Sequence, residues 1–314
     1  MGIIPSLIFA FVFVITLFPA NVLGDHHAAA PGPGPYCGPP EEDDRDLIQF
    51  AMNLEFFEAE YFLHGALGVG LDYFHPEYAM GGPPPYGAQK ANLDPVTRKI
   101  IEEFGYQEIG HLRAIVQTVG GFPRPLYNLS REQFAQVFDQ AVGHKLHPPF
   151  DPYANSVNYL LSCYVIPYMG LVGYEGMIPN LDYYHTKKLV GGLMGVEAGQ
   201  DAVLRTMLYK IAFEKVEPYG ITVADFTIGI SKLRNELARC GIKDEGLFVP
   251  LELGAENRTE SNILSADANS LTYGRLPSEI MRVVYGTGNE SIPGGFLPEG
   301  GNGRIARSYL EKVY

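Results

Sequence analysis

The sequence has little of what marks several common protein classes. Three cysteines, Cys37, Cys163 and Cys240, are too few for a disulfide scaffold, and their odd number leaves at least one unpaired. Lysine and arginine are scarce relative to aspartate and glutamate, so the net charge is -13 and no basic cluster is present. The sequence therefore argues against nucleic-acid binding, because contacts with phosphates need concentrated positive charge.

Long apolar runs are absent after the N-terminus, so we expect no transmembrane segment once a leader is removed. The one such run extends from Ile3 to Phe18, and residues 22–24 are suited to cleavage. This pattern is typical of a secretory signal peptide at residues 1–24, because a membrane span needs about 20 apolar residues. An uncleaved anchor is the alternative. We expect a secreted protein that is located outside the cell or in the cell wall.

Three Asn-X-Ser/Thr sequons agree with secretion, and they begin at Asn128, Asn257 and Asn289. Each is a weak signal of glycosylation by itself, because chance matches are common. Cys163 lies in an apolar segment, so we expect it to fill the core rather than to react.

The composition is that of a folded protein with a large core. Hydrophobic residues make up 46% of the 314 residues, which excludes the hydrophilic, disordered protectants. The pattern predicts a Pro/Gly-rich flexible leader at 25–40, a helical bundle at 41–241 and a C-terminal extension at 242–314. The extension is rich in glycine and proline, has one short helix near 278–285, and is expected to pack on the bundle.

Apolar periodicity and cap residues predict four long helices, at about 43–64, 94–120, 155–178 and 182–215. Pro167 is expected to kink the third of them. Shorter helices are predicted from the cap residues Ser130 and Thr222. No region is rich in strands. The expected fold is all-α, a four-helix bundle with a crossover connection, additional helices and a long irregular tail.

The main candidates for chemistry are acidic residues on apolar helix faces. Glu108 and His111 form an E-x-x-H step, which places a carboxylate and an imidazole one turn apart on one face. Glu197 lies where a ferritin-like bundle repeats this step, but Gln200 replaces the second histidine. The arrangement resembles a ferritin-like carboxylate site with one ligand changed.

The first long helix adds two more acids, and burying either without a partner would be costly. The predicted metal-ligand set is therefore Glu55, Glu58, Glu108, His111, Glu197 and Gln200. No cofactor is assigned from the residues alone, and iron and manganese are the candidates. In the alternative, a metal-free polar core, the carboxylates are protonated or paired with Arg113 or Arg205. The tyrosines expected near the site, in packing and hydrogen-bonding roles, are Tyr61, Tyr106, Tyr164 and Tyr168.

Several long blocks closely resemble the secreted desiccation-related proteins of plants, a family similar to a wider ferritin-like group. They include NLEFFEAEYFLHGALG, GGPPPYGAQKANLDP, QEIGHLRAI, GVEAGQDAVLR and VYGTGNESIPGGFLP. The resemblance covers nearly all of the chain after the signal peptide. It implies a ferritin-like fold, extracellular placement and accumulation under water deficit.

The resemblance also implies which ligands of the wider group are kept. Its inward positions match Glu55, Glu108, His111 and Glu197, whereas its helix 4 histidine falls on Gln200. Its helix 3 glutamate falls near Pro167 or Tyr168, where no carboxylate is present. Glu175 could compensate for it, but this residue lies two turns further, about 12 Å along the helix, which is too far to serve the same centre unless the register changes.

Two functions follow from these observations. The first is a non-catalytic, secreted protein of dehydration tolerance with a degenerate metal site, acting through cell-wall, glycan or metal contacts. The second is a metal-dependent oxidase, ferroxidase or peroxide-scavenging enzyme. The two missing ligands favour the first. A homo-oligomer is compatible with both.

Overall fold

The computed structural model describes residue 37 and residues 43–243 and 246–311. The predicted signal peptide at 1–24 and the leader at 25–40, apart from Cys37, lie outside these residues. In chain order the elements are α1 (Asp44–Leu67), α2 (Leu71–Phe74), α3 (Pro76–Ala79), α4 (Pro95–Val119), α5 (Arg131–Val142), α6 (Ser156–Val165), α7 (Pro167–Met177), η1 (Ile178–Asn180), α8 (Tyr184–Tyr209), β1 (Lys215–Val216), β2 (Ile221–Thr222), α9 (Val223–Ala238), η2 (Leu251–Leu253), η3 (Ala255–Asn257), α10 (Pro277–Tyr285) and α11 (Gly303–Leu310).

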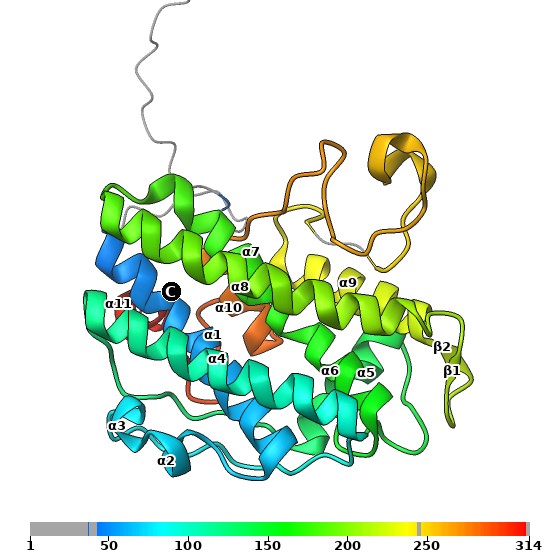
Figure 1. Cartoon of the computed structure of the whole chain (residues 1–314), viewed down its shortest axis with the longest axis horizontal. Helices are drawn as coiled ribbons and strands as arrows, with labels where there is room; N and C mark the ends of the chain where they lie inside the picture. Colours follow the sequence, from blue (N-terminus) through cyan, green and yellow to red (C-terminus); the bar gives the residue numbers. More distant parts are fainter. Residues whose placement is uncertain (1–36, 38–42, 244–245, 312–314) are drawn as a thin grey trace, which may run out of the picture. The chain divides into compact units, whose positions relative to one another are not determined.

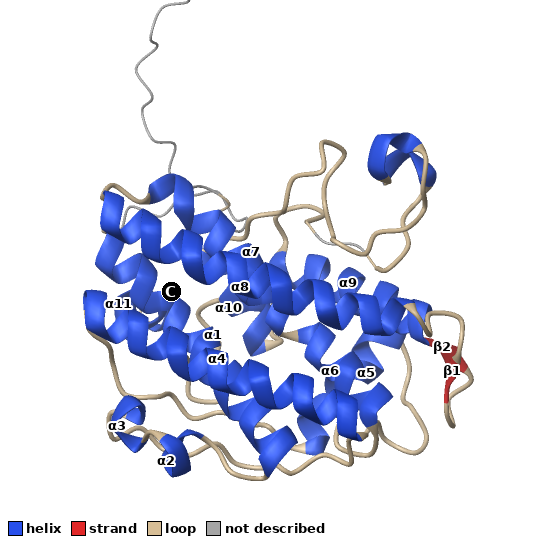
Figure 2. Cartoon of the chain, viewed as in Figure 1, coloured by secondary structure: helices blue, strands red, loops and turns tan. Residues whose placement is uncertain are grey.

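The helices α1, α4, α6–α7 and α8 form the central bundle (Figure 1). The helices α1 and α4 are antiparallel, since Gln49 near the start of α1 donates to the carbonyl of Val119 at the end of α4. At the other end of the pair, Arg98 donates to the carbonyl of Ala66. Strand is limited to the short antiparallel pair β1–β2 within the described residues (Figure 2). The predicted all-α four-helix bundle is thus confirmed.

The predicted cap residues Asp94 and Ser130 are the N-caps of α4 and α5. Asp94 accepts hydrogen bonds from the backbone N–H groups of Val96 and Thr97, and Ser130 accepts one from Gln133. These side-chain bonds satisfy N–H groups that have no partner within the helix.

The predicted third helix is broken into α6 and α7 rather than only kinked. The break lies at Ile166 and Pro167, because proline has no backbone N–H to donate to the preceding turn. The fourth helix ends at Tyr209 rather than near residue 215, where the chain turns into β1 instead.

The irregular C-terminal part is fastened to the bundle by helices and by buried arginines. The helix α10 packs against α7 and α9, and α11 packs against α1. Arg205 of α8 donates to the carbonyls of Gly246 and Ile263. The sequence analysis did not predict α2, α3 or α11, whose segments were expected to be loops.

The structure shows which cysteines are paired and how exposed the sequon asparagines are. Cys37 and Cys240 form a disulfide, and Cys163 is free and buried in the core, as predicted. Among the sequons, Asn257 is exposed and the other two asparagines are half-buried. Whether any of them carries a glycan stays a prediction. In the described part of the chain, no helix is both long and apolar enough to cross a bilayer.

Candidate metal centre

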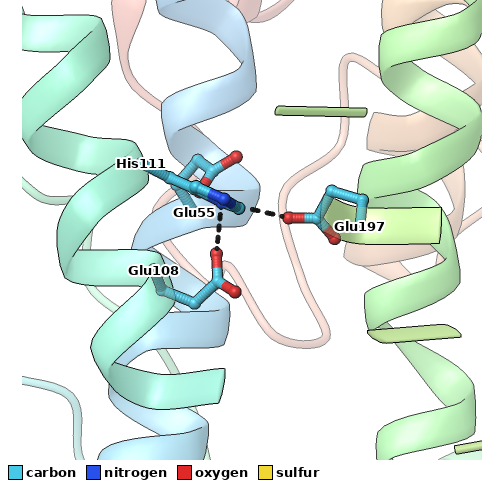
Figure 3. A group of neighbouring side chains, drawn as sticks. All are labelled: Glu55, Glu108, His111 and Glu197. Atoms are coloured by element: carbon cyan, nitrogen blue, oxygen red, sulfur yellow. Dashed lines mark hydrogen bonds and ion pairs between the residues drawn. The ribbon is translucent and has the colours of Figure 1, made fainter. Parts of the chain in front are cut away.

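Four side chains from three helices meet in the interior of the bundle. Glu55 comes from α1, Glu108 and His111 from α4, and Glu197 from α8 (Figure 3). One ligand atom of each lies within 4.8 Å of the others, and all four residues are buried. The structure therefore brings together the four residues that the resemblance singled out.

Three carboxylates face a single nitrogen atom in this centre. His111 Nδ1 lies 3.1 Å from Glu55 Oε2, 3.0 Å from Glu108 Oε2 and 3.3 Å from Glu197 Oε1. An imidazole nitrogen carries at most one hydrogen. One hydrogen cannot form good hydrogen bonds to three carboxylates. The negative charges of Glu55, Glu108 and Glu197 therefore lie close together with little positive charge from the protein to balance them.

The pKa values reflect this crowding. Burial and the neighbouring Glu197 raise the pKa of Glu108 well above its ordinary range, and burial raises that of Glu197 to about 7. Burial also acts to raise the pKa of Glu55, but the His111 imidazole outweighs it and lowers that pKa. Burial acts to lower the pKa of His111, and the carboxylates of Glu55 and Glu108 raise it instead. Without a metal, the centre is best described as a His111–Glu55 ion pair beside two carboxyls that hold protons to higher pH.

Gln200 contacts the centre as a hydrogen-bond donor. Its Nε2 donates to Glu108 Oε1 at 2.6 Å and to Gln107 Oε1 at 3.1 Å. Glu58 lies next to the centre but outside the group of four. Gln200 and Glu58 complete the predicted ligand set. Gln200 contacts the centre through a hydrogen bond, whereas Glu58 lies beside the centre without belonging to the group of four.

On α7, Gly170 faces the carboxylate of Glu197. A Cβ placed on Gly170 would lie 3.0 Å from Glu197 Oε2. The resemblance places the helix 3 glutamate near Pro167 or Tyr168, and the Tyr168 hydroxyl donates to the carbonyl of Lys243 rather than to a residue of the centre. Glu175 is half-buried beside Gly274 of the tail and away from the carboxylates.

Tyr174 is a site residue that the sequence analysis missed. Its hydroxyl donates to Glu55 Oε1. Of the tyrosines expected here, Tyr106 is instead exposed on α4. Tyr174 lies four residues after Gly170, so both are on one face of α7.

The alternative of carboxylates paired with arginine is not what the structure has. Arg113 Nε donates to the Tyr78 hydroxyl at 3.2 Å. Arg205 Nη1 donates to the Tyr164 hydroxyl at 2.9 Å, and its other nitrogens donate to backbone carbonyls. Both guanidinium groups are therefore committed elsewhere.

A small cavity adjoins the centre between α1, α7 and α10. Its volume is about 10 Å³, and its lining includes Glu55, Gly170, Gly173, Tyr174 and Ile280. A space of this size holds about one water molecule. The space next to Glu55 is thus no larger than about one water molecule.

Comparison with known proteins agrees with this geometry. The model of the ferritin-like domain family matches residues 43–210, which include all four residues of the centre. The chain is 62% identical over 270 residues to the ferritin-like catalase Nec2 of Nesocodon mauritianus, covering 86% of this chain and 87% of that protein. It is 52% identical over 263 residues to the desiccation-related protein PCC13-62 of Craterostigma plantagineum, covering 84% of each. No solved structure matches the chain.

Proposed function

This chain belongs to the ferritin-like domain family, and on that premise we propose that it decomposes hydrogen peroxide at a buried metal centre. The observation that carries the proposal is the convergence of Glu55, Glu108 and Glu197 on His111. The relative from Nesocodon mauritianus is named a catalase, which supports peroxide as the substrate. The small cavity beside Glu55 favours a small substrate over an extended organic one.

The residues present fit a divalent metal ion. Two ligands at about 2.2 Å from one ion are at most about 4.4 Å apart, so the observed 4.8 Å requires a shift of only a few tenths of an ångström. Three carboxylates and one imidazole suit iron or manganese. No lysine or arginine contacts these four residues in the described part of the chain, so an external cation is the natural source of compensating charge.

The protein residues would bind the ion, exclude bulk water and limit access to the centre. When bound, a redox-active ion supplies the electron transfers by which two peroxide molecules become two water molecules and one oxygen molecule. Binding the ion requires Glu197 and Glu108 to lose any proton they hold, so ion binding releases protons. The Tyr174 hydroxyl holds Glu55 in place through its hydrogen bond.

The proposal is tested by oxygen release from peroxide with protein that has been loaded with manganese or iron and freed of excess metal. We expect oxygen release by the wild-type chain and its loss in His111→Ala, together with loss of bound metal. Glu175→Gln is the matched control, because this acid lies by the tail rather than at the centre. A metal-loaded wild-type chain that releases no more oxygen than the variant contradicts the proposal.

A non-catalytic role in dehydration tolerance is the second candidate. It is supported by the name of the relative from Craterostigma plantagineum, and by Gly170 and Gln200 at positions where a ferritin-like bundle has ligands. Protection of a test enzyme through drying, by a chain that holds metal but does not consume peroxide, would favour this candidate.

Secretion remains part of the proposal. The Cys37–Cys240 disulfide supports it, because such bonds persist in oxidising compartments. The N-terminal sequence of protein recovered outside the cell should begin near Asp25, and a start at Met1 would contradict cleavage. Glycosylation, contacts with the cell wall or glycans, and a homo-oligomer stay predictions, to be checked by glycosidase treatment, wall-binding assays and light scattering.

A further inference from the structure

The helix α1 carries four buried acids, and three of them are compensated by the chain itself. Asp44 accepts hydrogen bonds from the backbone N–H groups of residues 182 and 183. Glu55 is paired with His111, and Glu60 with Arg124. The fourth, Glu58, is equally buried, but neither of its carboxylate oxygens has a hydrogen-bond partner among the described residues.

Glu58 points toward another incompletely compensated carboxylate. A Cβ placed on Gly170 would lie 3.2 Å from Glu58 Oε1 and 3.0 Å from Glu197 Oε2, so both oxygens approach the same point next to α7. The other oxygen of Glu197, Oε1, faces His111 Nδ1 at 3.3 Å. Neither oxygen of Glu197 accepts a well-formed hydrogen bond. Glu197 therefore stands between two groups, the histidine on one side and Glu58 on the other.

The absence of a side chain at Gly170 makes this arrangement possible. Any larger residue would place its Cβ closer to both carboxylate oxygens than most atoms in proteins approach. In a ferritin-like bundle this helix contributes a glutamate to the centre. Here α7 contributes space instead, and the carboxylate of Glu58 from α1 occupies the region beside it.

We propose that Glu58 is a metal ligand that replaces the carboxylate missing from α7, so that Glu58 and Glu197 hold a second divalent ion. Glu197 would then bridge this ion and the one at Glu55, Glu108 and His111. Four carboxylates balance the charge of two divalent ions, whereas one ion would leave two buried negative charges in excess. This inference rests on the metal centre proposed above, but not on peroxide being its substrate.

Metal content per chain tests the inference without an activity assay. The full chain is loaded with manganese(II), passed over a desalting column and analysed by elemental mass spectrometry. We expect about two ions per chain for the wild type and about one for Glu58→Gln. Glu175→Gln is the matched control and should keep both ions. Circular dichroism and thermal melting confirm that each variant is folded.

A second variant tests the space at Gly170 rather than the ligand Glu58. Gly170→Ala removes no ligand, yet its methyl group intrudes between Glu58 and Glu197, so we expect it also to lower the content to about one ion. Combining Glu58→Ala with Gly170→Glu returns the carboxylate to α7 and should restore about two ions. This rescue would not occur if Glu58 had only a packing role.

Several results would overturn the inference. Two ions in Glu58→Gln would show that Glu58 is not a ligand. One ion in the wild type would exclude the second ion, and loss of all metal from Glu58→Gln would exclude two separable ions. In each of these cases the peroxide proposal can still hold. A wild-type chain that binds no manganese or iron refutes both proposals.

Discussion

Replacing Glu197 by glutamine should stabilise the metal-free protein and remove its response to metal. The carboxylates of the centre lie no more than 4.8 Å apart, and at that limit two ionised carboxylates repel each other by about 3.5 kcal/mol at an effective dielectric constant of about 20. The pKa of Glu197, about 7 against an ordinary 4.5, gives a similar cost of about 3 kcal/mol for its ionisation. Glu197→Gln removes this cost at pH 8.

The net gain is smaller because the new amide is also polar and buried. An imperfectly bonded buried amide costs about 1 kcal/mol, which leaves a gain of about 2 kcal/mol. For a folded chain of this size, that corresponds to a rise of about 3–4 °C in Tm. The comparison is made by thermal unfolding at pH 8 after removal of metal, with Glu175→Gln as the control that should show no rise.

Adding metal should make the wild type more stable than Glu197→Gln, which reverses the order expected without metal. Free metal at about 100 times its Kd stabilises the wild type by about 2.7 kcal/mol, whereas the variant lacks one ligand and gains much less. A purely structural polar core makes the opposite prediction, because Glu197 would then contribute favourable contacts in the absence of metal. Lower stability of metal-free Glu197→Gln, with equal responses of both proteins to metal, would refute the reasoning.

Three further predictions follow from the described contacts. The fold raises the pKa of Glu197 and so favours its protonated form, so the unfolding free energy of the metal-free protein should fall as pH rises through about 7. Urea titrations at pH 6 and pH 8 measure this fall, and an increase in unfolding free energy would contradict the raised pKa of Glu197. Gly173→Ala, whose methyl group would enter the small cavity beside Ile280, should lower oxygen release while metal content is unchanged, and an unaltered rate would show that substrate enters elsewhere. Arg124→Met should cost about 3 kcal/mol by removing the buried guanidinium that pairs with Glu60, which keeps only His64 and the Leu71 N–H as partners among the described residues, compared with less than about 0.5 kcal/mol for the exposed Arg131→Met; similar urea midpoints for both variants would disprove it.

The sequence predicted those parts of the centre that have a local signal. Glu108 and His111 are three residues apart on one helix face, and Glu55 and Glu197 are acids within apolar stripes. Each pattern is visible within one helix. Their meeting could be expected only because a ferritin-like bundle directs such faces toward a common interior.

The rest of the centre depends on how the helices are placed, which no local pattern specifies. Gly170 gives no positive signal, because its contribution is the space that it leaves for Glu58 and Glu197. Tyr174 could not be assigned while residues 155–178 were treated as one helix with a kink, since the break before Pro167 sets which face of α7 is inward. The Cys37–Cys240 disulfide joins residues separated by 203 positions and is equally invisible to local reasoning.

The distribution of buried positive charge supports an external cation at the centre. Five arginines are fully buried in the described chain: Arg124, Arg205, Arg234, Arg275 and Arg282. Their hydrogen-bond partners include backbone carbonyls, such as that of Asn262 for Arg205 and that of Tyr164 for Arg234, and acids outside the centre, such as Glu60, Glu279 and Glu290. Burying a guanidinium group without such bonds is costly, so these arginines are held away from the centre. The chain thus compensates buried acids such as Glu60 and Glu279 with its own arginines. At the centre, by contrast, the carboxylates of Glu55, Glu108 and Glu197, with Glu58 beside them, have His111 as the single cationic group. A divalent ion supplies the charge that this arrangement lacks.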